Sequence, residues 1–218
     1  TNWNRSTEDC TLSAQGRQAL VRAALFSREI TLGEWSAASD SPDDAALAEL
    51  LASGLILQTD TGYALQHDLL RAQVVDALPA AEREALHARI ARALAGRGAP
   101  PAEIAAHCEQ GGLWSQACEH LRAAADEAIR LSAIANAEAY AARAEQAIAR
   151  GELGAREKLH ARHLRLRLAQ SRAWSDDAQA EAVALTRDAL ALEDWATAIW
   201  AMRAQFRVLA LAGRFDEL

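Results

Sequence analysis

Residues 113–150 read LWSQACEHLRAAADEAIRLSAIANAEAYAARAEQAIAR, and this stretch decides the fold. Alanine, the strongest helix former, supplies 54 of the 218 residues of the chain and is dense here. The apolar residues recur with helical periodicity, which predicts two helices of about 15 to 20 residues joined by a short turn. Small side chains recur where antiparallel helices must approach closely, at Ala117, Ala124, Ala137, Ala141 and Ala144.

Helices joined by short turns continue on both sides of this stretch. Within residues 80–98, Leu86, Ile90 and Leu94 repeat at every fourth position, as the apolar face of a helix does. Further helices are expected over 100–110, 154–174, 178–192 and 194–212. Helices of this length with turns of about two to four residues are typical of a helical solenoid. The prediction is an all-α fold over most of the chain, with a solenoid domain spanning 79–218.

The first 78 residues predict a different unit. Ser13 begins a helix as its N-cap, Ile30 and Thr31 are extended, and a second short helix follows. A third helix is expected to begin at Ser41 with Pro42 in its first turn and to end at Gly54 in the left-handed conformation. Residues 55–58 and 63–66 then read as a β-hairpin. Three helices and a hairpin in this order predict a winged-helix-like domain over residues 1–78.

The charge of this unit argues against DNA binding. A winged helix usually contacts DNA through cationic and amide side chains on its third helix. Residues 29–70 contain no Lys or Arg and eight acidic residues, and the whole chain has a formal net charge of −7. DNA phosphates would repel such a surface. We therefore expect no direct nucleic-acid binding.

Two longer segments carry a family resemblance, namely residues 63–98 and residues 101–148. They resemble the region after the nucleotide-binding module in large bacterial signal-transduction ATPases (STAND proteins) of the maltose-regulator, large LuxR and SARP types. Trp114, Ala117 and Leu121 match the first helix of a tetratricopeptide repeat, and Tyr140 and Ala144 match its second. The family pattern also includes residues 66–71, 86–87 and 106–107, in structural positions.

The resemblance implies a winged helix followed by a tetratricopeptide-like arm, in a bacterial transcriptional regulator. The arm would recognise an effector ligand or a protein partner and couple that event to the ATPase module of the parent chain. The alternative is a tetratricopeptide-type interaction scaffold unrelated to transcription. The last residues, LALAGRFDEL, read as a turn and the start of another helix. We expect the arm to be truncated there.

The sequence offers no catalytic signature. The phosphate-binding pattern GxxxxGK[ST] needs a Lys after Gly, and the single Lys, Lys158, does not follow one. We therefore expect this fragment not to be an enzyme and to hold no cofactor; an ATPase module would lie upstream. The pairs His107-Cys108 and Cys118-x-His120 could supply zinc ligands, but without a CxxC or HxxxH spacing, helix packing is the better explanation.

One stripe of charge suggests a binding site. Lys158, Arg162, Arg165 and Arg172 fall on one side of the predicted helix over 154–174. They could receive an anionic ligand or an acidic partner, or they could be a solvated face paired with acids of neighbouring helices. No apolar run reaches the length of a membrane span, and no signal peptide is present. We expect a cytoplasmic protein that does not enter a membrane.

Overall fold

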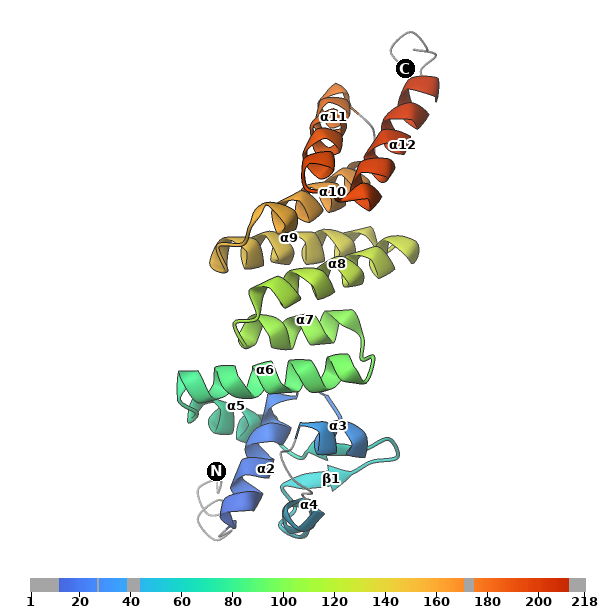
Figure 1. The fold of residues 1–218 in the computed structure, drawn as a ribbon. Coiled ribbons are helices and arrows are strands. Elements are labelled where there is room, and N and C mark those ends of the chain that lie inside the picture. The colour runs from blue at the N-terminus through green and yellow to red at the C-terminus, as the bar shows by residue number, and fades with distance from the viewer. Residues whose placement is uncertain (1–11, 27, 39–43, 171–174, 212–218) are drawn as a thin grey trace. The chain divides into compact units, whose positions relative to one another are not determined.

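The computed structural model describes residues 12–26, 28–38, 44–170 and 175–211 (Figure 1). The chain divides into two compact units, residues 1–99 and 100–218. The described part is mostly helical with a single two-stranded hairpin, which confirms the predicted fold class. Unit 1 contains α2 (Ala14–Leu25), α3 (Leu32–Ala37), α4 (Asp44–Ala52), β1 (Ile56–Gln58), β2 (Tyr63–Leu65), α5 (Asp68–Asp76) and α6 (Ala80–Gly96). Unit 2 contains α7 (Pro101–Gln110), α8 (Trp114–Arg130), α9 (Ile134–Arg150), α10 (Ala155–Gln170), α11 (Asp176–Ala191) and α12 (Trp195–Leu211).

The two compact units divide between Ala99 and Pro100, and the predicted domain boundary at residue 78 stays a prediction. Helix α6 belongs to unit 1 because it packs against α3, and the Arg97 side chain at its end lies directly against Gly33. Helix α5 was also missing from the prediction, which placed no helix between the hairpin and Pro79. Ser41 and Pro42, the predicted start of the third helix, lie outside the described residues. In the described part of the chain, helix α4 begins at Asp44.

Local signals in unit 1 act as expected. The Ser13 hydroxyl accepts a hydrogen bond from the Gly16 backbone N–H at 2.9 Å and so caps α2. Gly54 has a φ of +69° and ends α4 in the left-handed region. The hairpin pairs Ile56 with Leu65 and Gln58 with Tyr63, and an isolated bridge joins Ile30 to Tyr63.

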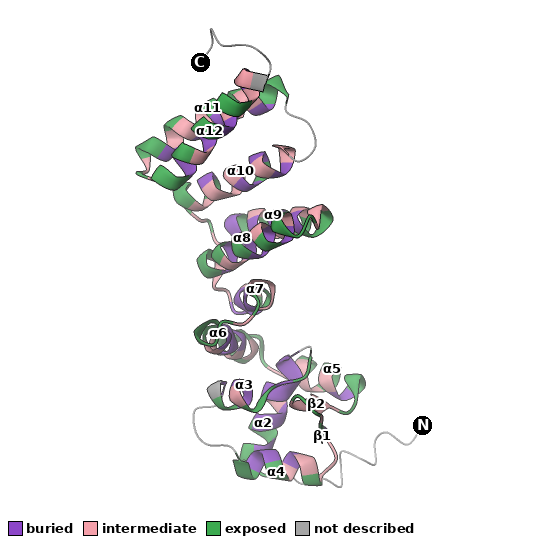
Figure 2. Ribbon diagram, turned by 90° about the vertical axis from the view of Figure 1, so that its right-hand side faces the viewer, coloured by how far each residue is buried: buried purple, intermediate pink, exposed green. Residues whose placement is uncertain are grey.

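In unit 2 the helices pack on their neighbours in sequence: α7 on α8, α8 on α9, α9 on α10 and α11 on α12. Buried and exposed residues alternate along these helices (Figure 2). All five alanines predicted at helix contacts are buried, and Ala144 packs with Leu121 and Ala105 in the core between α7, α8 and α9. None of the described helices has the length and apolar character of a membrane span.

One turn recurs through this unit. Gly112, Ser132, Glu152 and Glu193 each follow a helix with a φ between 50° and 66°. In each turn the next residue donates its backbone N–H to the carbonyl five positions earlier, as Ala133 does to Ala128 at 2.8 Å. This bond satisfies a carbonyl that the helix end leaves free. The first three turns are 20 residues apart, so each step of the array is one helix plus one tight turn.

Candidate functional site

The predicted cationic stripe is largely used for helix packing. The Arg162 guanidinium on α10 pairs with two acids of α11: its Nε lies 2.7 Å from Glu181 Oε1 and its Nη1 lies 2.8 Å from Asp188 Oδ2. Arg165 turns to α9, where its Nε lies 2.5 Å from Glu145 Oε1. The bonds to Glu181 and Asp188 raise the pKa of Arg162. Hydrogen bonds from Arg162 and Arg187 lower the pKa of Asp188.

The other two members of the stripe are not bound in this way. Lys158 is exposed and pairs with no acid in the described part of the chain, and Arg172 lies outside the described residues. Arg162 and Arg165 thus connect α10 to two different neighbours instead of lining one groove. Ligand binding by Lys158, Arg162, Arg165 and Arg172 stays a prediction.

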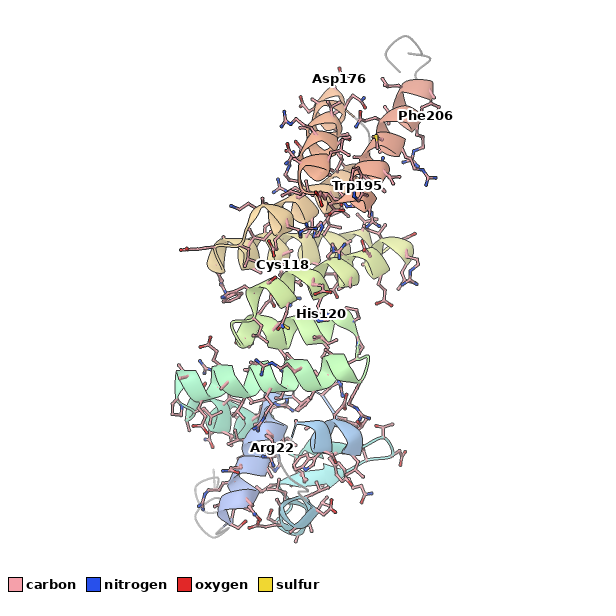
Figure 3. All side chains as sticks on the ribbon, viewed as in Figure 1. Arg22, Cys118, His120, Asp176, Trp195 and Phe206 are labelled. Atoms are coloured by element: carbon pink, nitrogen blue, oxygen red, sulfur yellow. The ribbon has the colours of Figure 1, made fainter. Side chains whose placement is uncertain are left out.

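The outer side of α12 is an apolar surface that sequence reasoning missed. Four large side chains on it are exposed: Trp195 (61%), Ile199 (50%), Met202 (44%) and Phe206 (60%). Their spacing of four, three and four residues places them on one side of the helix, from Trp195 near its start to Phe206 in its last turns (Figure 3). This spacing is readable in the sequence, and it is the seam that a second helix packs against in a coiled coil. We call these four residues the α12 stripe.

A groove accompanies the α12 stripe. Its volume is about 990 Å³, and its walls include Ile199, Met202 and Phe206 together with Arg203 and Arg207. Both arginines are exposed and make no hydrogen bond or ion pair with a described residue. Helix α12 itself contains no Asp or Glu, although the chain as a whole is acidic. The lining of the groove therefore combines apolar side chains with two arginines.

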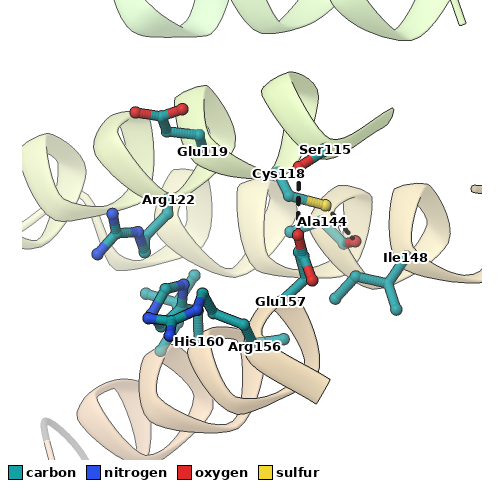
Figure 4. A pocket seen from close by; sticks show the side chains of 11 residues that line it. Ser115, Cys118, Glu119, Arg122, Ala144, Ile148, Arg156, Glu157 and His160 are labelled. Carbon is teal, nitrogen blue, oxygen red and sulfur yellow. Dashed lines mark hydrogen bonds between the residues drawn. The ribbon is translucent and has the colours of Figure 1, made fainter. Parts of the chain in front are cut away.

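A smaller pocket of about 300 Å³ lies between α8, α9 and α10 (Figure 4). The Cys118 side chain is buried beside it, with Sγ 3.5 Å from the carbonyl oxygen of Ala144. Burial, with a contribution from Glu157 and Glu109, raises the pKa of the Cys118 thiol to about 11. A thiol with such a pKa is almost wholly protonated near neutral pH, so Cys118 is a poor nucleophile and a poor metal ligand.

The polar lining of this pocket is separated by charge. Arg122, Arg156 and His160 gather toward one end, and Glu157 accepts a hydrogen bond from the Ser115 hydroxyl toward the other (Figure 4). The pocket is built from residues far apart in sequence, 115–164, and no local pattern signals it. Among the described residues, no three His, Cys, Asp or Glu side chains come together as a metal site would need. His107 and Cys108 are buried in α7.

Two side chains of the pocket lining, Arg156 and His160, are attached to the turn before α12. Arg156 Nη2 donates to the Leu192 carbonyl at 3.0 Å, and His160 Nε2 lies 2.7 Å from Asp194 Oδ2. The other oxygen of Asp194 accepts a hydrogen bond from the Thr197 backbone N–H at 3.0 Å and so caps α12. Burial opposes ionisation of Asp194, but the hydrogen bonds from Thr197 and His160 outweigh it and lower the pKa of this carboxyl.

Comparison with known proteins gives one structural likeness. The chain resembles a Signal Transduction ATPase with Numerous Domains (STAND) protein with a tetratricopeptide repeat sensor, from Pyrococcus horikoshii, at a TM-score of 0.37 and 14% sequence identity. The likeness covers 93% of this chain and 45% of that one, so the chain spans less than half the length of that protein. No protein-family model and no curated protein matches the chain.

Proposed function

We propose that the chain is the recognition arm of a bacterial signal-transduction regulator and that it works by binding a helix of another protein, or of its own parent protein, along α12. The regulator would carry its nucleotide-binding module upstream and act in the cytoplasm. The sequence resemblance to STAND regulators supports this context. The observation that carries the binding role is the α12 stripe.

The physical argument starts from the cost of exposure. Burying a large apolar side chain contributes about 1.5–3 kcal/mol relative to leaving it in water, so four such side chains on one face are a strong driving force for association. Contiguous exposed apolar patches of this kind mark interaction sites. An amphipathic helix fits a groove by placing residues at spacings of three and four in it. The α12 stripe has the same spacing.

In this proposal unit 1 is a winged helix that serves packing or coupling and does not bind DNA. The acidic residues of 29–70 support this assignment, because counterion release needs cations on the protein.

Site-specific photocrosslinking tests the binding role. A benzoylphenylalanine is placed at Phe206 in the groove or at Val183, a matched control that is 53% exposed on α11. In cells that produce the parent protein, we expect crosslinks from position 206, to one defined segment, and none to that segment from position 183. Adding Ile199→Glu should remove the product while the protein keeps its helical circular dichroism. The same products from both positions, or none from 206, would refute the proposal.

A further inference from the structure

The pocket between α8, α9 and α10 has the size and lining of a small-ligand site. Its volume of about 300 Å³ lies at the lower end of the range for ligand pockets, which suits a molecule of about ten heavy atoms. Its walls combine apolar side chains such as Ile148 and Leu164 with a few polar groups. This combination, an apolar lining with few polar groups that orient the ligand, is usual in binding sites.

Arg122 is the group that indicates which ligand fits. Its side chain lies on α8 at the pocket, is half-buried, and makes no hydrogen bond or ion pair with any described residue. Most arginines near it in unit 2 are used: Arg143 pairs with Glu109, Arg162 with Glu181 and Arg167 with Asp126. A guanidinium presents donors in a planar fork that matches the two oxygens of a carboxylate or phosphate.

Two further nitrogen-bearing side chains lie toward the same end of the pocket as Arg122. Arg156 and His160 are held toward the same end of the pocket by their bonds to Leu192 and Asp194, so they are already oriented before any ligand arrives. The neighbouring His163 is buried close to several of these groups. Burial is the main cause that lowers its pKa to about 4, and Arg167, His160 and Arg122 all lower it further, against an opposing effect of Asp126.

We infer that this pocket binds a small organic anion, with its carboxylate or phosphate group on Arg122 beside Arg156 and His160, and a hydroxyl or amino group directed toward Glu157. Glu157 is half-buried and accepts one hydrogen bond, from Ser115 at 3.2 Å, so its carboxylate has acceptor sites left for a donor on the ligand. Glu119 is an exposed acid in the lining of the same pocket. A hydroxy acid, an acidic amino acid or a sugar phosphate has the required two ends.

Anion binding in the pocket does not depend on the proposed function. The effect of that binding on α12 does rest on the proposed function. Arg156 and His160 also hold the turn at Leu192–Asp194, from which α12 begins. An anion bound beside Arg156 and His160 would share these side chains with the Leu192 carbonyl and the Asp194 carboxylate. Occupancy of the pocket would thereby alter the anchoring of α12, which carries the α12 stripe.

Isothermal titration calorimetry of the full 218-residue chain tests the site, with L-malate, citrate and glycerol 3-phosphate as probes and glycerol as the uncharged control. We expect saturable one-to-one binding of at least one anion and none of glycerol. Arg122→Gln should weaken that binding about tenfold or more, because a hydrogen bond to a charged group is lost twice in a bidentate contact. Arg122→Lys keeps the positive charge but loses the planar pair of donors. Its affinity for the anion should lie between those of the unchanged chain and Arg122→Gln.

Arg130→Gln is the matched control, since Arg130 lies on the same helix and is exposed away from the pocket lining. It should bind as the unchanged chain does. Circular dichroism confirms that each variant is folded. The inference is overturned if none of the three anions binds below about 10 mM, or if Arg122→Gln and Arg130→Gln bind equally well. Either result leaves the crosslinking test of α12 unaffected, so the two proposals fail separately.

Discussion

Reversing the charge of Arg162 should weaken the attachment of α10 to α11. In the structure this guanidinium lies between Glu181 and Asp188, at 2.7 and 2.8 Å. Arg162→Glu removes both ion pairs and brings a third carboxylate to the same place. The pairing therefore predicts a loss of stability.

The size of the effect follows from how exposed the three side chains are. The exposed fractions are 34% for Arg162, 41% for Glu181 and 33% for Asp188, so water screens the interaction substantially. Exposed ion pairs contribute about 0.2–1 kcal/mol each, and like charges at the same distance cost a similar amount. Losing two pairs and gaining two repulsions gives about 2 kcal/mol, which lowers the melting temperature by about 4–8 °C in a chain of this size.

Thermal unfolding followed by circular dichroism measures this at low salt and in 1 M NaCl. Lys158→Glu is the matched control on the same helix, because Lys158 is exposed and unpaired among the described residues; it should change stability by no more than about 0.5 kcal/mol. In 1 M salt, where the Debye length is about 3 Å, the difference between the two variants should shrink by half or more. If Arg162→Glu melts together with Lys158→Glu at low salt, the ion pairs do not hold α10 against α11 and the reasoning fails.

Three further predictions concern single sites or unit 1. The hydrogen bond from Arg28, with those from Thr31, lowers the pKa of Glu34 to about 2 in the folded chain from an ordinary 4.5, so its stabilisation is complete above pH 4.5 and disappears toward pH 2. Glu34→Gln should therefore cost about 1–3 kcal/mol at pH 7 and nothing near pH 2, measured by urea unfolding across that range. Glu152 has a φ of +50°, so Glu152→Gly should stabilise the chain by about 0.5–1 kcal/mol, whereas Gln146→Gly inside α9 should destabilise it by about 1 kcal/mol; equal effects in urea titrations would contradict the turn geometry. The chain should not bind random duplex DNA in fluorescence anisotropy, because residues 29–70 contain no cation; salt-sensitive micromolar binding would contradict this.

The sequence predicts correctly those helix ends that are determined by residues close to them in the chain. Ser13 and Gly54 mark helix ends through a hydroxyl and a missing Cβ, and both act as expected. The turns at Ser132 and Glu193 use the same left-handed geometry without glycine, so composition does not reveal them. The partners of Arg162 could not be predicted, because they depend on how α11 lies against α10.

The same distinction applies to the candidate sites. The α12 stripe could have been predicted from its residue spacing alone, since four large apolar residues on one face of a predicted helix are expected to pack against another surface. Its exposure, however, is a property of the folded array. The pocket is lined by residues of three helices, among them Ala144 of α9 and Ala161 of α10. No stretch of sequence encodes it by itself.

Substitutions of Asp194 test whether the pocket and α12 are coupled, because its two carboxylate oxygens have different hydrogen-bond partners. Oδ1 caps α12 through the Thr197 N–H, and Oδ2 holds His160 at the pocket. Asp194→Asn keeps a good N-cap and loses the charge that faces His160, whereas Asp194→Ala loses both functions and should cost about 1 kcal/mol more in urea unfolding. In a chain labelled with 5-fluorotryptophan, the Trp195 fluorine signal should shift when the anion found by calorimetry saturates the pocket. The shift should be much smaller in Asp194→Asn, although the anion still binds through Arg122. An unchanged shift in Asp194→Asn would show that α12 senses the pocket by another route, and no shift in the unchanged chain would show that it does not sense the pocket at all.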